Sequence, residues 1–409
     1  MENRVINAAI LGAGTVGGGV YKLAQAMEED IFHKTGARLV IKKMLVRNVN
    51  KERKGIPSEI LTDDWNSIIN DPEIDIIVEL MGGITPAKKY VIEALNAGKQ
   101  VVTANKDLLA EYGEEVMSAA EKSGNDLQFE AAVAGAIPII RPLKQSMAGN
   151  HITEVMGIVN GTTNFILTKM TEKGMDYADA LAEATELGYA EADPTADVEG
   201  YDAGRKIAIM ASIAFNSRVT FSQVYTEGIT KISADDIRYA KEFGYVIKLL
   251  GVARNVDGQI EVKVHPMLID ENHPLATVKD AFNAVFVHGN MLGDAMFYGS
   301  GAGKLPTASA VVGDIVDAAK HLHVNIVTNW NSTPAVLKPL DEVTGRFFVR
   351  IKKEAAEEAK KVFGDVEIIS LGQLPQECAF ITDEMTQGAF EEKLAQIGDQ
   401  VLAKIRVKD

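Results

Sequence analysis

Apolar runs separated by glycine-rich turns and helical patterns mark the first 130 residues of the chain. Val5–Leu11 is a mostly apolar run typical of a buried strand, and the pattern of Val20–Met27 beyond the next turn predicts a helix. Further strands are predicted at Arg38–Val46, Ile74–Leu80, Gln100–Thr103 and Leu127–Val133, with a helix from Pro86 to Ala97. Strands that alternate with helices predict an α/β domain built on a parallel sheet.

The pattern changes after Pro138. A strand at Ile152–Val159 and a helix at Tyr177–Leu187 belong to a stretch without regular alternation, which predicts an α+β domain. Residues 324–341 are rich in turn formers and are interpreted as a linker. From about residue 345 the order strand, helix, strand, strand, helix, strand predicts a small ferredoxin-like unit, with VEIISLGQ at 366–373 as its second strand.

A G-x-G-x-x-G motif lies between the first strand and the first helix. Gly12 permits the tight turn, Gly14 lets the backbone approach a pyrophosphate, and Gly17 allows close packing of helix on strand. The helix N-terminus that follows faces the phosphates. The motif therefore predicts dinucleotide binding by a Rossmann-type domain, and the alternative is a turn that is merely rich in glycine.

The end of the second strand indicates which dinucleotide is bound. An NAD-binding protein usually carries an acidic residue there for the ribose 2′-hydroxyl, whereas this strand ends in Arg47, followed by Lys51, Arg53 and Lys54. A cation at this position favours the 2′-phosphate of NADP, although NAD stays possible. The alternative is a solvated basic loop. Lys106, just beyond the fourth strand, is expected on the cofactor side or simply in solvent.

The acidic stretch at 188–206, GYAEADPTADVEGYDAGRK, leads directly into an apolar run. Asp202 and Lys206 are four residues apart and share a helix face, at the point where the acidic loop meets a buried helix. A lysine that loses solvation there can act as an acid or base near neutral pH. The alternative is an ordinary surface ion pair at a helix start.

Composition excludes several classes of protein. The net charge of −15 disfavours nucleic-acid and anionic-membrane partners, and no segment is long and apolar enough to span a membrane. One cysteine, Cys378, excludes an intrachain disulfide framework and fits a reducing compartment, so a cytoplasmic protein is expected. His321 and His323 have no accompanying ligand cluster, which argues against zinc.

Taken together, these motifs resemble homoserine dehydrogenase. The segments that carry the resemblance are ILGAGTVGGGV, VVTANK, EAAVAGAIPI, GIVNGTTNFIL, LGYAEADPTADVEGYDAGRK and GAGKLPTASAVVGD, in this order over most of residues 1–323. The tail is similar to a regulatory ACT domain. The resemblance implies the reversible NAD(P)-dependent interconversion of L-homoserine and L-aspartate 4-semialdehyde, in threonine, methionine and isoleucine biosynthesis.

The resemblance also implies a division of the chain and its assembly. A Rossmann-type NAD(P)-binding domain is expected at 1–137, completed by a helix at 304–323, with a catalytic and dimerisation domain at 138–303 and an ACT-like domain at 345–409. A homodimer or homotetramer is expected.

Site residues follow from the same resemblance. Lys206 is expected to transfer the proton, with Lys106 between cofactor and substrate. The expected substrate contacts are Glu191, Asp202, Tyr189 and Thr162. The expected cofactor contacts are Gly12, Gly14, Thr15, Val16, Gly17, Arg47, Thr103, Lys106 and Gly303. A sodium site is expected from the Glu130 carboxylate and the carbonyls of Val133, Gly135 and Ile137.

Two alternative functions stay open at this point. An aspartate semialdehyde dehydrogenase would need a nucleophilic cysteine in its catalytic domain, but Cys378 lies in the tail. A non-catalytic NADPH-binding sensor would be expected to lack Lys206 or Asp202, and both are present. In the tail, no Pro or Gly lies between Arg346 and Phe363, so the ligand-binding turn typical of ACT domains is not marked, and little effect of threonine is expected.

Overall fold

The computed structural model describes residues 4–326, 328 and 330–408, and the chain divides into two compact units. The first unit comprises residues 1–151, 208–221 and 297–334, and the second comprises 152–207, 222–296 and 335–409. Within the described residues, none of the helices combines the length and the apolar content needed to cross a membrane.

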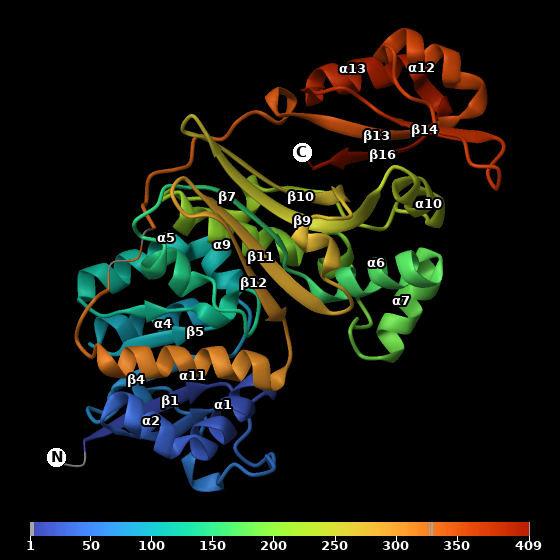
Figure 1. Ribbon diagram of the computed structural model, residues 1–409. Coiled ribbons are helices and arrows are strands. Elements are labelled where there is room, and N and C mark those ends of the chain that lie inside the picture. Colours follow the sequence, from blue (N-terminus) through green and yellow to red (C-terminus); the bar gives the residue numbers. More distant parts are fainter. Residues whose placement is uncertain (1–3, 327, 329, 409) are drawn as a thin grey trace. The chain divides into compact units, whose positions relative to one another are not determined.

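In the described chain, a six-stranded parallel sheet forms the centre of the first unit, in the order β3-β2-β1-β4-β5-β6 (Figure 1). Its strands are β1 (Val5–Leu11), β2 (Arg38–Leu45), β3 (Leu61–Thr62), β4 (Ile76–Glu79), β5 (Gln100–Thr103) and β6 (Leu127–Gln128). Its helices are α1 (Thr15–Ala26), α2 (Glu28–Thr35), α3 (Asn66–Ile69), α4 (Ala87–Asn96), α5 (Lys106–Ser123) and α11 (Lys304–Lys320). The strand order reverses at β1, and ligands of such sheets bind at this switch point, outside the carboxyl ends of the strands.

Helix α11, drawn in orange in Figure 1, packs against α1 although nearly 280 residues separate them in the sequence. Gly19 of α1 makes the close approach possible, because a Cβ there would lie 3.1 Å from Lys304 and 3.2 Å from Ala308. Val311 and Ile315 of α11 join Ile10 of β1 in one buried apolar cluster. The fold of the first unit thus depends on a segment from the later part of the chain.

The second unit contains a mixed sheet that has ten strands in the described residues, with the path β12-β11-β7-β9-β10-β16-β13-β14. Its strands are β7 (Ile152–Ile158), β8 (Tyr225–Thr226), β9 (Tyr245–Val256), β10 (Gln259–Asp270), β11 (Phe282–Gly289), β12 (Gly293–Ser300), β13 (Thr344–Lys352), β14 (Glu377–Ile381), β15 (Met385–Thr386) and β16 (Val401–Val407). Its helices are α6 (Gly161–Lys173), α7 (Tyr177–Glu186), α8 (Thr195–Val198), α10 (Ala234–Glu242), α12 (Ala356–Phe363) and α13 (Gln387–Ile397). Helix α9 (Tyr201–Ala214) and strand β12 are each divided between the two units.

The C-terminal tail continues this sheet. Strand β16 pairs in parallel with β10 through Met267–Arg406 and Leu268–Val407, and it pairs antiparallel with β13 on its other side. Helices α12 and α13 cover a core in which the rings of Phe347 and Phe390 stack with centroids 3.9 Å apart. The elements of the tail follow in the order β13, α12, β14, α13, β16. This is the predicted ferredoxin-like order, except that the predicted second strand, at 366–373, is not a full strand.

Two strand predictions are wrong in part. The predicted strand Leu127–Val133 ends at Gln128, and a 3-10 helix (Glu130–Ala132) follows, because the backbone turns there to bring the Glu130 carboxylate to the N–H groups of residues 139–141. The predicted strand at 366–373 is reduced to one bridge between Ile369 and Ala379. The other strands and helices named above lie within a few residues of their predicted bounds.

Candidate active site

The glycine motif adopts the geometry that dinucleotide binding requires. Gly12 has a φ of +104°, and a Cβ there would lie 2.7 Å from the Leu80 carbonyl oxygen. A Cβ on Gly17 would lie 2.0 Å from the Gly12 carbonyl oxygen, so only glycine lets α1 begin this close to β1. A Cβ on Gly14 would meet nothing within 4 Å, which leaves open the space in front of the helix N-terminus.

A cleft of about 720 Å³ opens at the carboxyl ends of β1, β2 and β4. Arg47, Lys51 and Arg53 bring positive charge to it from the loop after β2, and the Arg53 guanidinium donates to the carbonyls of Asn48 and Lys51 at 3.0 and 2.7 Å. The remaining lining residues are Gly12, Ala13, Gly14, Leu45, Val46, Asn48, Asp63, Leu80, Met81, Gly82, Pro86 and Tyr90. Sequence reasoning did not single out Tyr90, which enters from α4 with no motif to mark it.

Side-chain hydrogen bonds hold the ends of β4 and β5 in place. The buried Glu79 carboxylate accepts from the Thr103 hydroxyl at 2.7 Å and from the Met81 N–H at 2.8 Å, and burial raises the pKa of this carboxyl group. Asn105 caps α5 by accepting from the Leu108 N–H at 3.0 Å. Lys106 is the first residue of α5, so it stands at the strand-end position expected of it.

Lys206 lies largely buried in a cluster of polar groups. Its ammonium donates to Asp202 Oδ2 at 2.6 Å and to the Val159 carbonyl, just after β7, at 2.7 Å. The two charged side chains are only 13% and 12% exposed. The pair is therefore not an ordinary surface ion pair, because both partners have lost most of their water.

Asn160 connects this pair to a second carboxylate. Its amide nitrogen donates to Asp202 Oδ2 at 2.9 Å and to Asp197 Oδ1 at 2.7 Å, while its amide oxygen caps α6 by accepting from the Thr163 N–H at 2.9 Å. Burial raises the pKa of Asp197, and the hydrogen bond from Asn160 opposes that shift. Sequence reasoning assigned no role to Asn160 or Asp197. An asparagine placed directly before a helix was the available signal.

Of the other expected substrate residues, Tyr189 and Glu191 lie on the segment between α7 and α8, and Thr162 lies in the first turn of α6. The buried Thr162 hydroxyl donates to the Tyr189 carbonyl at 2.7 Å, which ties the start of α6 to this segment. The Tyr189 ring packs against Phe165 with centroids 4.8 Å apart and stays 46% exposed. Glu191, two residues further on, is exposed.

Glu130 is buried and surrounded by hydrogen-bond donors. Its Oε1 accepts from the N–H groups of Ile139 and Ile140 at 2.6 and 2.7 Å, and its Oε2 accepts from the Arg141 N–H at 2.9 Å. Its own N–H donates to the buried Asp314 at 2.8 Å. Burial, and then the Glu130 charge, raise the pKa of Asp314 to about 8.

The residues after Glu130 turn sharply and bring several carbonyls together. Ala134 and Gly135 both have positive φ, of 54° and 58°. Among the hydrogen bonds of the described chain, the buried carbonyls of Val133, Gly135 and Ile137 receive no backbone N–H donor. Carbonyls that no backbone N–H occupies can serve as oxygen ligands of a cation.

Gly303 precedes α11 with a φ of +117°. The loop before it lies against the turn just described, because a Cβ on Gly135 would approach the Gly301 carbonyl to 2.5 Å. The loop that carries Gly303 and the loop of carbonyls are thus packed together in the first unit.

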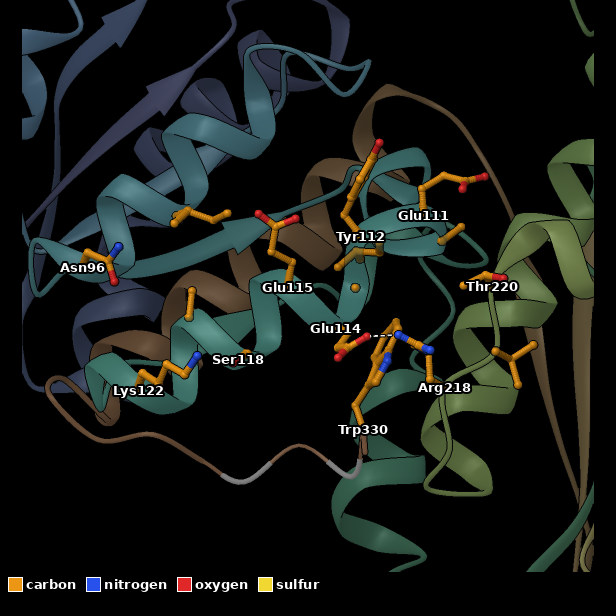
Figure 2. A pocket seen from close by; sticks show the side chains of 16 residues that line it. Asn96, Glu111, Tyr112, Glu114, Glu115, Ser118, Lys122, Arg218, Thr220 and Trp330 are labelled. Carbon is orange, nitrogen blue, oxygen red and sulfur yellow. Dashed lines mark hydrogen bonds and ion pairs between the residues drawn. The ribbon is translucent and has the colours of Figure 1, made fainter. Parts of the chain in front are cut away.

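A separate cavity of about 600 Å³ lies beside α5 and holds none of the expected site residues (Figure 2). Trp330 packs where α5 is interrupted by a non-helical Tyr112, and a Cβ on Gly113 would lie 2.3 Å from its ring. Figure 2 shows Trp330 beside the ion pair of Glu114 and Arg218. The close contact with Trp330 explains why a glycine stands at position 113.

Comparison with known proteins identifies the family. The family model "Homoserine dehydrogenase" matches residues 138–316, and "Homoserine dehydrogenase, NAD binding domain" matches residues 12–130. The homoserine dehydrogenase of Bacillus subtilis is 41% identical over 413 residues, which cover 97% of this chain and 95% of that protein. This chain belongs to the homoserine dehydrogenase family.

Further relatives agree. The homoserine dehydrogenase of Corynebacterium glutamicum is 52% identical over 321 residues, covering 77% of this chain and 72% of that protein. The crystal structure of a homoserine dehydrogenase from Thiobacillus denitrificans matches with a TM-score of 0.92 and 39% identity over 99% of both chains. A hyperthermophilic archaeal homoserine dehydrogenase, solved in complex with NADPH, matches with a TM-score of 0.65 and 27% identity over 77% of this chain and 97% of that one.

The family, the α/β fold with its Rossmann-type domain, and the activity predicted from the sequence are therefore confirmed. The chain is an oxidoreductase with homoserine dehydrogenase activity, and it carries a domain that binds a nicotinamide nucleotide. The alternatives of a semialdehyde dehydrogenase or a non-catalytic sensor are set aside.

Proposed function

We propose that Lys206 transfers the proton in the interconversion of L-homoserine and L-aspartate 4-semialdehyde. The observation that carries this proposal is the largely buried amine, held by Asp202 and by the Val159 carbonyl. In the oxidation direction the Lys206 amine takes the hydroxyl proton of the substrate as the carbinol carbon gives up its hydride. The bound nicotinamide supplies the hydride acceptor.

Charged groups around Lys206 suit a zwitterionic substrate. We propose that Glu191 and Asp202 hold the substrate ammonium, with Tyr189 and Thr162 beside them. The hydrogen bond from Thr162 to the Tyr189 carbonyl supports this, because it fixes the segment that carries Glu191. Asp202 also aligns the Lys206 amine, at an Nζ–Oδ2 distance of 2.6 Å.

We propose NADP as the preferred cofactor. The basic residues Arg47, Lys51 and Arg53 line the cleft where the adenosine ribose of a dinucleotide lies in Rossmann-type folds. The NADPH bound to the archaeal relative supports this proposal. Remaining cofactor contacts are proposed for Gly12, Gly14, Thr15, Val16, Gly17, Thr103, Lys106 and Gly303.

We propose a sodium site at the turn after Glu130. The buried Glu130 carboxylate and the carbonyls of Val133, Gly135 and Ile137 fit a hard monovalent cation, since all four supply oxygen ligands. Because the Gly135 turn packs against Gly301, a cation here would stiffen the loop that leads to Gly303. Its proposed role is structural.

The tail is proposed to serve subunit association in a homodimer or homotetramer, with threonine having little effect on the reaction. Strand β13 runs through a 3-10 turn (Lys353–Ala355) directly into α12, which supports the absence of an open ligand-binding loop. The same proposal includes a cytoplasmic location and three domains. These are the NAD(P)-binding domain at 1–137 with 304–323, the catalytic domain at 138–303 and the ACT-like domain at 345–409. Titration of L-threonine into the assay tests it, and saturable inhibition that disappears on removal of residues 344–409 would contradict it.

Parallel assays test the cofactor and substrate together. Initial rates are measured with L-homoserine and either NADP or NAD, at matched concentrations. We expect faster reduction of NADP at subsaturating cofactor. An equal or larger rate with NAD would reject the NADP preference, and no rate with either would reject the proposed reaction.

A further inference from the structure

Lys248 of β9 is a lysine buried without an ion-pair partner among the residues that the structure describes. It is 5% exposed, and its amine donates to the Asn164 side-chain oxygen at 3.0 Å and to the Val278 carbonyl at 2.5 Å. Burying an amine in this way is costly, and burial, followed by the Lys279 charge, lowers the pKa of Lys248 to about 8. An apolar side chain would avoid that cost, so the reason for an amine here lies in the two groups that it holds.

The first of these groups, Asn164, fastens helix α6 to the segment 278–282. Asn164 is 1% exposed, and its amide nitrogen donates to three carbonyls of that segment at 2.9–3.2 Å. Gly161 lies directly against the same segment, because a Cβ there would be 2.8 Å from the Ala281 carbonyl oxygen. The Asn164 oxygen needs a donor of its own, and Lys248 supplies it, which fixes the orientation of the amide.

The start of α6 in turn carries the groups that hold Lys206. Asn160 caps α6 one turn before Asn164, and its amide nitrogen donates to Asp202 Oδ2 at 2.9 Å. Val159, the residue before Asn160, accepts from the Lys206 amine at 2.7 Å. A shift of the first turn of α6 would therefore move both the carbonyl and the amide that determine the direction of the Lys206 amine.

We propose that Lys248 is a positioning residue for Lys206. Through the Asn164 amide and the Val278 carbonyl it holds the start of α6 against the segment 278–282, and the start of α6 places the Lys206 amine. This role rests on the proposed proton transfer by Lys206, and it needs no contact of Lys248 with substrate or cofactor. It also does not depend on the charge of Lys248, because a neutral amine keeps two N–H groups, one for each acceptor.

The kinetics of Lys248→Met test the inference. Methionine keeps most of the side-chain volume but leaves the Asn164 oxygen without its donor. We expect kcat for homoserine oxidation to fall about 10-fold, because a small displacement of a catalytic group can cost up to about 100-fold, and we expect the KM for NADP to stay unchanged. All rates are measured at a temperature at which melting curves show the variant to be folded.

Lys263→Met is the matched control. Lys263 lies on the neighbouring strand β10, is also 5% exposed, and burial likewise lowers its pKa to about 8. It makes no printed bond to α6 or to the segment 278–282, and its closest carboxylate is that of Glu261 at 3.5 Å. We expect Lys263→Met to lose a comparable amount of stability and to keep the kcat of the wild type.

A double variant shows whether Lys248 acts through Lys206. Lys206→Met alone should lose most of its turnover, and adding Lys248→Met should lower the residual kcat no further. A further 10-fold loss in the double variant, or a wild-type kcat in Lys248→Met, would overturn the inference. Wild-type turnover in Lys206→Met would instead reject the proposed role of Lys206. If Lys248→Met does not fold, the milder Lys248→Gln replaces it with the same deciding outcomes, since its shorter side chain cannot reach both acceptors.

Discussion

Replacing Lys206 by methionine removes the amine and keeps a side chain of similar length and shape. The variant loses the hydrogen bonds to Asp202 and Val159, but Asp202 keeps its bond from Asn160 at 2.9 Å. The carboxylate is therefore not left without a donor. We expect the variant to fold, to bind NADP, and to lose most of its turnover.

The magnitudes separate a folding effect from a catalytic one. Loss of charged hydrogen bonds at a group 13% exposed costs about 1–3 kcal/mol of unfolding free energy, which lowers the melting temperature by a few degrees. Loss of a general acid or base lowers kcat about 10²–10⁴-fold, equivalent to about 3–5 kcal/mol of transition-state stabilisation. A variant that is still folded at the assay temperature cannot lose 100-fold in rate through instability.

The assay measures kcat and KM for homoserine oxidation, with NADPH binding followed separately by fluorescence. Lys169→Met is a matched control, because Lys169 is 16% exposed and pairs with Asp280, and not with Asp202, at 2.7 Å in the same unit. We expect a comparable loss of stability from it and little loss of kcat. A kcat near that of the wild type in Lys206→Met would refute the reasoning.

Four further predictions follow from the same geometry. Arg47→Ala should raise the KM for NADP far more than that for NAD, and equal effects would show that Arg47 does not contact the 2′-phosphate. The wild type should melt at a higher temperature in sodium than in a large organic cation, and Glu130→Ala should abolish that difference. Burial raises the pKa of Asp314 to about 8, so the folded protein keeps a proton there that the unfolded chain releases near pH 4. The free energy of unfolding should therefore fall as the pH rises from about 4 to 8. Urea midpoints measured across this range should fall less steeply with pH in Asp314→Asn than in the wild type. Gly113→Ala should cost about 1–3 kcal/mol by overlap with Trp330, and adding Trp330→Leu should recover part of the loss.

Local pattern predicts most of the first unit because each signal there acts over a few residues. Gly17 needs its glycine for a contact with the Gly12 carbonyl five residues earlier, and the strands are apolar runs of the predicted kind. The predicted strand at Leu127–Val133 failed because its apolar residues are buried for another reason. The run contains Glu130, whose carboxylate accepts from the N–H groups of residues 139–141, and no apolar pattern can show that contact.

Long-range contacts set the limits of prediction at the site. The spacing of Asp202 and Lys206 predicts that they share a helix face, but not that both are buried. Burial comes from Val159 and Asn160, more than 40 residues earlier, which reach the pair from the end of β7.

The pairing at Lys206 also fixes where the lysine can act. Its Nζ lies 2.6 Å from Asp202 Oδ2. Asn160 donates to the same oxygen, Oδ2, and through its second N–H to Asp197, so the carboxylate that holds the amine is itself held in place. The Val159 carbonyl accepts a proton of the amine at 2.7 Å and directs Nζ without adding charge. A lysine held in this way by a carboxylate and a carbonyl keeps a fixed direction, and proton transfer requires such a fixed position of the transferring group.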